Sequence, residues 1–411
     1  MRKQFLITLA TLIICFSVSA QSWYIVDSPA DRELKTIQFI SDDIGFIGGD
    51  SVLLKTVDGG ITWNEIISDF ENSDWPQSLD VLDLHFFDED HGYVMSGLYG
   101  AMLETFDGGI TWTSVAVASG FCQPVSLYFE NENYGFAGGA GCFEGHIIGK
   151  YVDGTWTQTE DPQDWSGTNY VTTINFKNSD LGIAGTIGGT ILRTTDGGDV
   201  WDTIPNLAEG HPITGIDFDV DLIRVSHHNV SQFGSMISSD DGLTWEYDTE
   251  LASFFYPQFN ALHTTEDGTA YAAGKLSNND FVDGVIFEKQ ELSWIATPTL
   301  YNINDLGSHS GSSVFAVGEF GAIYTNREEI ANGIEDLQIE TINIYPNPSN
   351  GEFTVECFDS KVRELTLQNN LGQTVWRQKV SSPGVSVELN VPVGVYMLTE
   401  NGQFLKKLVV E

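Results

Sequence analysis

Aspartates recur at equivalent positions of one repeated segment. The four fullest copies follow the pattern Ser/Thr-x-Asp-x-Gly and end in tryptophan, and they contain Asp58, Asp107, Asp196 and Asp240. A fifth, shorter copy contains Asp153. A carboxylate can serve as a general acid or base, but at a tight turn it can also accept backbone N–H bonds. We expect the structural role, because function has to be argued from a site and not from a fold element.

Other carboxylates fall in the longer loops, where a pair of them could hydrolyse a glycosidic bond. These residues are Asp74, Asp161, Asp164, Glu209 and Glu319. An acidic chain produces such coincidences easily, and the sequence nominates no catalytic pair. No phosphate-binding glycine loop or nucleophile elbow occurs in a suitable context. We therefore expect no enzyme activity and no cofactor.

Metal-ligating residue types are present, but their spacing is unfavourable. His227 and His228 are adjacent on an expected strand and would point to opposite faces, which argues against a shared site with His211. The oxygen-rich segment 278–284 departs from the spacing of an EF-hand loop. Cys122 and Cys142 lack Cys-x-x-Cys spacing, so a disulfide between them is a better expectation than a metal site. We predict no metal.

Aromatic residues in the long loops could stack on sugar rings or anchor a protein partner. The alternative is that single rings fill crevices between packed sheets. The candidate ligand-binding residues are Trp75, Phe121, Trp165, Tyr170, Phe254, Phe255 and Tyr256.

The elements that would position these residues are repeats of four short strands. The marker tryptophans are 44 to 49 residues apart from Trp63 to Trp294, which suits a propeller blade. The last unit, within 314–326, has no closing tryptophan, and Trp23 in the segment 22–26 supplies it. We predict an all-β, seven-bladed β-propeller over residues 21–330, closed by this N-terminal strand. In each blade, the turn between the first and second strands and the turn between the third and fourth strands lie on one side of the propeller, which we call the short-turn side. The loops between the second and third strands and the loops between blades lie on the opposite side, which we call the long-loop side.

The repeated motif resembles the Asp box of BNR repeats and of propellers similar to photosystem II assembly factors. The resemblance implies a propeller scaffold, which sialidases share. Sialidases clamp the substrate with three converging arginines, and the expected positions of Arg193 and Arg327 beside the short turns do not assemble such a clamp with Arg32 and Arg224.

The segment 341–411, after an expected linker at 331–340, follows a different pattern of strands and Pro, Asn and Gly turns, as in a small Ig-like β-sandwich. It resembles the type A C-terminal sorting domain of the type IX secretion system, although an accessory Ig-like domain is an alternative interpretation. The resemblance implies export through the outer membrane, followed by release or surface attachment. The matching residues are Tyr345, Pro346, Asn347, Pro348, Gly351, Gly372, Gly394, Tyr396, Lys406 and Lys407.

Charge and the N-terminus agree with an exported protein. Residues 1–20 have two basic residues, an apolar run and small residues, which is typical of a signal peptide. The formal charge is −40, a field that repels nucleic acid and anionic lipid, and we expect no nucleic-acid partner and no membrane insertion. The favoured function is a secreted or surface-attached, non-catalytic module that binds a glycan or protein. A carboxylate-based glycoside hydrolase is the alternative, and a passenger without a ligand also fits.

Overall fold

A computed structural model of the chain provides the fold. It describes residues 23–67, 80–96, 101–117, 121–141, 146–159, 169–205, 208, 210–219, 221–228, 234–251, 257–278, 281–290, 293–311, 313–331, 342–345, 349–357, 363–369, 374–380, 384–389, 391–400 and 403–410. The expected signal peptide and most of the expected linker lie outside this set. The chain separates into two compact units, Met1–Gly333 and Ile334–Glu411.

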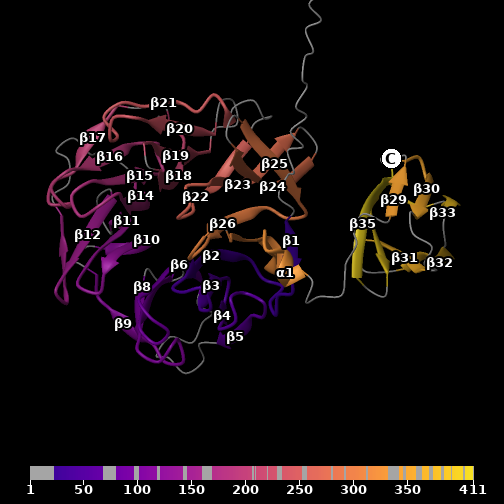
Figure 1. The fold of residues 1–411 in the computed structure, drawn as a ribbon, viewed down its shortest axis with the longest axis horizontal. Coiled ribbons are helices and arrows are strands. Elements are labelled where there is room, and N and C mark those ends of the chain that lie inside the picture. The colour runs from indigo at the N-terminus through magenta and orange to yellow at the C-terminus, as the bar shows by residue number, and fades with distance from the viewer. Residues whose placement is uncertain are drawn as a thin grey trace, which may run out of the picture. The chain divides into compact units, whose positions relative to one another are not determined.

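The described part of the first unit forms seven four-stranded antiparallel sheets. The first strands contact one another and lie toward the centre of the ring of sheets in Figure 1. They are β2 (Leu34–Phe39), β6 (Val81–Phe86), β10 (Phe121–Asn131), β14 (Val171–Phe176), β18 (Ile213–Phe218), β22 (Pro257–Thr264) and β26 (Ile303–Gly307). The second strands are β3 (Gly45–Gly49), β7 (Gly92–Ser96), β11 (Tyr134–Gly141), β15 (Gly182–Thr186), β19 (Ile223–His227), β23 (Ala270–Asn278) and β27 (Phe315–Gly318).

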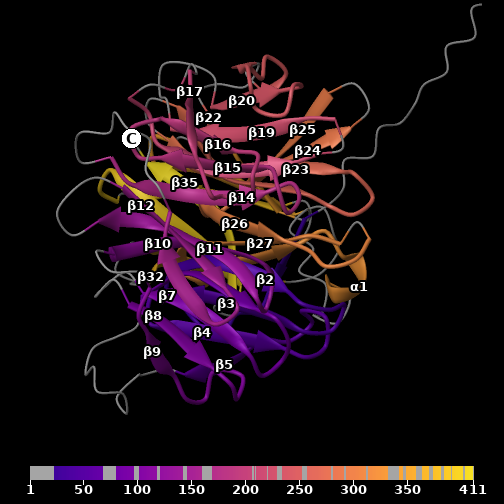
Figure 2. The ribbon, with the colours of Figure 1, turned by 90° about the vertical axis from the view of Figure 1, so that its left-hand side faces the viewer.

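The third and fourth strands complete each sheet, as the row from β14 to β17 illustrates in Figure 2. The third strands are β4 (Val52–Thr56), β8 (Ala101–Thr105), β12 (His146–Val152), β16 (Ile191–Thr194), β20 (Ser235–Ser238), β24 (Phe281–Gln290) and β28 (Ile323–Thr325). The fourth strands are β5 (Asn64–Ile67), β9 (Thr113–Val115), β13 (Thr155–Gln158), β17 (Asp202–Ile204), β21 (Glu246–Tyr247), β25 (Ser293–Thr299) and, from the N-terminal end, β1 (Tyr24–Val26).

The sheet that contains β26, β27 and β28 takes its outer strand from the start of the chain. Tyr24 pairs with Thr325 and Val26 with Ile323 in antiparallel register. A 3₁₀ turn, η2 (Glu319–Gly321), connects β27 to β28, and the short helix α1 (Glu328–Ala331) follows β28. The predicted β-propeller is confirmed as the fold of this unit.

Glycine in the second strand makes room for an inner-strand phenylalanine. A Cβ atom on Gly92 would lie 2.5 Å from a ring carbon of Phe86, and one on Gly135 would lie 2.3 Å from Phe129. The rings can pack directly on the backbone only because no side chain intervenes. This contact explains why a glycine opens so many of the second strands.

Inner strands are joined to their neighbours by a recurring side-chain hydrogen bond. Thr214 Oγ1 donates to the carbonyl of Phe259 (2.7 Å), and Asn260 Nδ2 donates to that of Ile303 (2.7 Å). Asn304 continues the series with a bond of 2.8 Å to the carbonyl of Leu34. Because the sheets share no backbone ladder, these bonds and the apolar clusters between sheets hold the unit together.

The second unit is a small β-sandwich, as the sequence predicts. One sheet contains β29 (Ile342–Tyr345), β30 (Glu352–Cys357) and β33 (Gly384–Glu388), and the other contains β31 (Arg363–Asn369), β32 (Thr374–Val380), β34 (Gly394–Glu400) and β35 (Gln403–Val410). Its core includes Phe353, Leu365, Leu398 and Leu408, all nearly or fully buried.

Candidate functional site

The repeated aspartates hold their own turns together. Asp58 Oδ1 accepts the backbone N–H of Thr62 (2.9 Å), and its other oxygen accepts the Thr62 hydroxyl (2.6 Å). Thr56 donates its hydroxyl to Asp58 (2.8 Å) and accepts the N–H of Gly60 (2.9 Å). The same four bonds recur at Asp107 and at Asp240. Three of them recur at Asp196, where Val200 has no hydroxyl to supply the fourth.

These hydrogen bonds favour the ionised carboxylate. The hydroxyl and backbone N–H of Thr244 and the hydroxyl of Ser238 lower the pKa of Asp240 to about 2. The pKa of Asp107 is also lowered, first by the hydroxyl of Thr111. A group that remains ionised and is bonded within its own turn is poorly suited to proton transfer near neutral pH.

Asp153 departs from this pattern, because its copy of the segment is two residues shorter between the aspartate and the tryptophan. It occupies a two-residue hairpin with Gly154, and the two residues have φ values of 46° and 83°. Aspartate tolerates the left-handed region better than most residues do. The residue therefore shapes a turn, but by its backbone and not by the network seen at Asp58.

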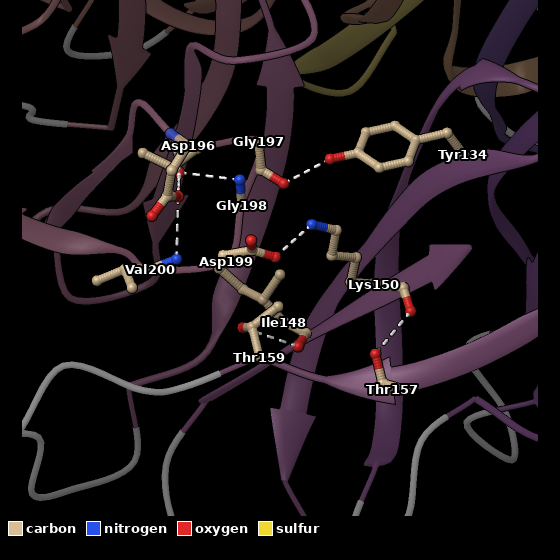
Figure 3. Close-up of polar contacts among 11 residues, drawn as sticks. Tyr134, Ile148, Lys150, Thr157, Thr159, Asp196, Gly197, Gly198, Asp199 and Val200 are labelled. Carbon is tan, nitrogen blue, oxygen red and sulfur yellow. Dashed lines mark hydrogen bonds and ion pairs between the residues drawn. The ribbon is translucent and has the colours of Figure 1, made fainter.

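Basic side chains from one sheet dock on the turn of the next. Lys150 contacts Asp199 (2.6 Å), and Tyr134 donates its hydroxyl to the carbonyl of Gly197 (2.5 Å), as Figure 3 shows. Arg193 donates to the carbonyl of Asp241 (2.6 Å), and Arg327 to that of Gly59 (2.8 Å). These contacts stabilise the seams between sheets.

The four arginines of the propeller occur in four separate settings. Arg32 pairs with Glu65 and donates to the carbonyl of Ser51 (2.5 Å). Arg224 is buried against Asp248, with its Nε 3.1 Å from the carboxylate. Since Arg193 and Arg327 bind the short turns of different sheets, the described contacts do not converge on one carboxylate-sized ligand.

Carboxylates on the inner strands have the opposite electrostatic behaviour to those of the turns. Desolvation raises the pKa of Asp305 to about 7, although its oxygens accept the backbone N–H groups of Ile37 and Leu306. Desolvation also raises the pKa of Asp83 to about 6 against similar bonds from Leu127 and Leu84. Each carboxylate links its own strand to the next inner strand, which is a structural role.

Few of the predicted aromatic residues can be placed. Phe121 lies in β10, opposite Gly141, and its half-buried ring packs against a core cluster. The loop expected at Phe121 is thus a strand, because the β10–β11 hairpin extends through Phe121, and the ring fills space between sheets. Tyr170 is half-buried, and its carbonyl accepts the N–H of Ile187 (3.0 Å). Outside the described residues lie Trp75, Trp165, Phe254, Phe255 and Tyr256.

The histidines considered as metal ligands have separate surroundings, and the disulfide candidates cannot be placed. His228 bonds Asn260 (2.9 Å), whereas His227 is fully buried on the other face of its strand, and desolvation lowers its pKa to about 4. No cluster of three or more His, Cys, Asp or Glu side chains suited to a metal ion occurs in the part of the chain that the structure describes. Cys142 and the side chain of Cys122 lie outside that part.

A small polar pocket of about 260 Å³ lies on the short-turn side, between the first and last sheets. Phe39 and Phe315 contribute its apolar lining, and Asp42 accepts hydrogen bonds from Ser310 and His309 at its rim. The hydrogen bonds to Asp42 lower its pKa, with Ser310 the largest contributor. The polar groups of the rim thus bind one another.

The long-loop side also exposes two aromatic residues that the sequence analysis did not select. Phe320 lies between β27 and β28 and is 68% exposed, and Tyr301 lies between β25 and β26 and is 37% exposed. Their ring centroids are 5.3 Å apart at an interplanar angle of 51°. The two rings therefore form an open, tilted pair, here called the Tyr301–Phe320 pair.

Phe320 is held in this place at a conformational cost. Its φ of 57° and ψ of 32° lie in the left-handed region, which a bulky aromatic residue rarely adopts. The turn is clamped on both sides, because a Cβ atom on Gly318 would lie 1.9 Å from the carbonyl oxygen of Asn302, and one on Gly321 would lie 1.8 Å from that of Ala30. The backbone on both sides of Phe320 is therefore packed closely against neighbouring carbonyls. The only sequence features that point to Phe320 are its aromatic type and its position between two expected strands.

The loop of Tyr301 is fixed as well. Thr299 donates its hydroxyl to the carbonyl of Tyr301 (2.8 Å), and the N–H of Leu300 donates to the hydroxyl of Tyr324 (3.1 Å). A Cβ atom on Gly284 would lie 1.8 Å from the carbonyl oxygen of Tyr301, so this loop packs directly on β24. Both rings of the pair thus stand on rigid backbone, which lowers the entropy lost on binding.

The sorting residues fall within the second unit. Tyr396 is buried and donates its hydroxyl to the carbonyl of Pro392 (2.6 Å), and Gly351 has a φ of 97° in a turn against Leu389. Gly394 begins β34 and Tyr345 ends β29. Lys406 and Lys407 belong to β35, and Pro346, Asn347, Pro348 and Gly372 are outside the described residues.

Comparison with known proteins identifies this second unit. Residues 343–411 match the family of secretion system C-terminal sorting domains. The sorting domain predicted from the sequence is confirmed, and the chain is exported by the type IX secretion system to the cell surface or the medium. Among the described residues, no helix is long and apolar enough to cross a membrane. A comparison with curated protein sequences gives no significant match.

Solved structures support the fold of the first unit. YCF48 from Cyanidioschyzon merolae is 17% identical over 75% of this chain and 99% of its own, with a TM-score of 0.57. A streptogramin B lyase is 12% identical over 74% and 97%, with a TM-score of 0.56. A GH74 xyloglucanase from Xanthomonas campestris is 11% identical over 85% of this chain and 57% of its own, with a TM-score of 0.55. At these identities the likeness concerns the fold alone.

Proposed function

We propose that the propeller is a non-catalytic binding module that recognises an extracellular glycan or protein through its long-loop side. The observation that carries the proposal is Phe320, an exposed aromatic residue held in a strained backbone conformation beside Tyr301. Strained residues persist where the surrounding structure imposes them, and they concentrate at ligand sites. Loops on a rigid scaffold are also the usual place for recognition.

The described charged groups support binding over catalysis. The aspartates of the short turns are bonded within those turns, and the pKa of Asp240, for example, is lowered to about 2. Asp83 and Asp305 are bonded to backbone N–H groups of neighbouring inner strands. A glycoside hydrolase needs one carboxyl group that donates a proton and a second that acts as nucleophile or base. Neither set provides such a pair.

The alternative, a carboxylate-based glycoside hydrolase, draws on the fold likeness to the GH74 xyloglucanase. Its activity would require acids such as Asp74, Asp161, Asp164 or Glu209, which belong to loops outside the described residues. Binding without product supports the module, and product formation supports the hydrolase.

The test is binding of the purified full chain to an array of glycans and extracellular proteins, with product analysis of every ligand that binds. Phe320→Gly and Tyr301→Ala should each weaken a specific interaction about tenfold or more, since truncating an aromatic anchor costs about 2 kcal/mol or more. Phe106→Ala is the matched control, because Phe106 is 66% exposed on the short-turn side. Equal losses for all three variants, or turnover of a ligand, would contradict the proposal.

A further inference from the structure

The propeller repeatedly places a cation over an aromatic ring. Lys150 Nζ lies 5.2 Å from the ring centroid of Tyr134, and the Arg224 guanidinium lies 5.1 Å from that of Trp294. Lys55 Nζ lies 5.3 Å from the ring centroid of Phe46. Such contacts are attractive because the face of an aromatic ring carries negative potential.

An oxygen acceptor completes each of these contacts. Lys150 also pairs with Asp199 (2.6 Å), which Figure 3 shows on the turn next to Tyr134. Arg224 pairs with Asp248 (3.1 Å), and Lys55 donates to the carbonyl of Glu89 (3.0 Å). The internal arrangement is therefore a cation between a ring and an anionic or carbonyl oxygen.

The Tyr301–Phe320 pair is open to solvent, and acidic residues lie close to it along the backbone. Glu319 precedes Phe320 in the chain, and the exposed Asp31 follows Ala30, whose carbonyl packs on Gly321. Among the described contacts, no lysine or arginine lies over either ring.

The basic residues nearest in sequence to the two rings and to Asp31 have partners elsewhere in the protein. Lys289 pairs with Glu250, and Arg327 donates to the carbonyl of Gly59 (2.8 Å). Arg32 pairs with Glu65, and Lys35 pairs with Asp50 (2.7 Å) and Asp80. Desolvation opposes protonation of Lys35, but these two carboxylates raise its pKa overall, which keeps the ammonium in place. No described contact places one of these basic side chains over the aromatic pair, so a partner can supply the cation.

We infer that the Tyr301–Phe320 pair, with Glu319 and Asp31 beside it, binds an arginine or lysine side chain of an extracellular polypeptide. The inference rests on the proposed function and names the partner's chemistry. Two rings at 51° offer two faces to a planar guanidinium. The formal charge of −40 steers a basic segment toward the protein, and the aromatic pair selects where its cation binds.

The test uses twelve-residue Gly/Ser peptides that carry three arginines, three lysines or three citrullines. Citrulline keeps the shape of arginine without its charge. Binding to the full chain is measured by calorimetry at two ionic strengths. We expect the arginine and lysine peptides to bind at least about tenfold more tightly than the citrulline peptide, with the affinity falling as salt rises.

Matched variants separate the site from general attraction to an acidic protein. Phe320→Gly and Glu319→Gln should weaken binding of the arginine peptide about tenfold and about threefold. Phe106→Ala and Glu132→Gln, which change an exposed ring and an exposed carboxylate on the short-turn side, should leave the affinity unchanged.

Equal binding of the arginine and citrulline peptides, or an unchanged affinity in Phe320→Gly, would overturn the inference. If a neutral glycan binds the wild type but not Phe320→Gly, and the arginine peptide is not preferred, the proposed function stands and the inference of a bound cation is wrong. If no ligand depends on Phe320 for binding, both the proposed function and the inferred cation site are wrong.

Discussion

At the residue scale, aspartate has opposite properties at two kinds of position. On the short turns, nearby hydroxyl and N–H donors lower the pKa of Asp240 to about 2. On the inner strands, desolvation raises the pKa of Asp305 to about 7. Hydrogen-bond donors lower the pKa of the carboxyl groups on the turns, and loss of contact with water raises the pKa of those on the inner strands.

Asp305 should make the stability of the propeller depend on pH. Its pKa in the folded protein, about 7, exceeds the ordinary value of 3.8, because the buried site favours the protonated form. Its contribution to the free energy of unfolding is therefore complete below about pH 4 and is lost as the pH rises to 7. Between pH 5 and pH 8 the loss should be on the order of a few kcal/mol. Urea unfolding of the wild type and of Asp305→Asn at both pH values measures it. The difference between the two proteins should change with pH, and a constant difference would be inconsistent with the raised pKa.

At the element scale, the turns and strands depend on glycine for two separate reasons. Gly198 has a φ of 76°, and a Cβ there would also lie 2.4 Å from the ring of Phe136. Gly154 has a similar φ of 83°, but no atom lies within 4 Å of the position of a Cβ. The first glycine serves backbone conformation and packing, and the second serves conformation only.

Substitution with alanine should separate these two costs. Gly154→Ala should lower the free energy of unfolding by about 1 kcal/mol through backbone strain alone. Gly198→Ala should lower it by about 3 kcal/mol or more, because overpacking adds to the strain. Thermal or urea unfolding gives both values, and equal effects would show that the contact with Phe136 is relieved easily.

The strands and turns could be predicted from the sequence, whereas the exposed aromatic pair could not. The repeated segments around Asp58 and Trp63 indicate tight turns, and their regular spacing indicates a repeat. Both features can be read directly from the sequence. The strained Phe320 stands between Gly318, which packs on Asn302, and Gly321, which packs on Ala30. Ala30 is almost three hundred residues away, so no local pattern reveals it. Phe121 shows a different limit, since the segment expected to be a loop is a strand and its half-buried ring packs against a core cluster.

At the scale of the whole molecule, the two units have separate tasks. The sorting domain directs export, and nearly all of the excess negative charge belongs to residues before 336. Each unit has its own hydrophobic core. The propeller should therefore keep its fold when its partner unit is removed.

Deletion of residues 343–411 should stop export without unfolding the propeller. Immunodetection of the protein in cell and medium fractions measures export, and the unfolding midpoint of the purified propeller measures its stability. We expect the truncated protein to remain in the cell with an unchanged midpoint. Export of the truncated protein would mean that a second signal exists in the propeller.

The central claim is that Phe320 is maintained for binding at the expense of stability, and the free energy of unfolding of Phe320→Gly tests it most directly. Glycine adopts a φ of 57° freely, and the ring it replaces is 68% exposed. The account predicts that the variant is as stable as the wild type or up to about 1 kcal/mol more stable. A loss of more than about 1 kcal/mol would show that the ring supports the fold and would contradict the account.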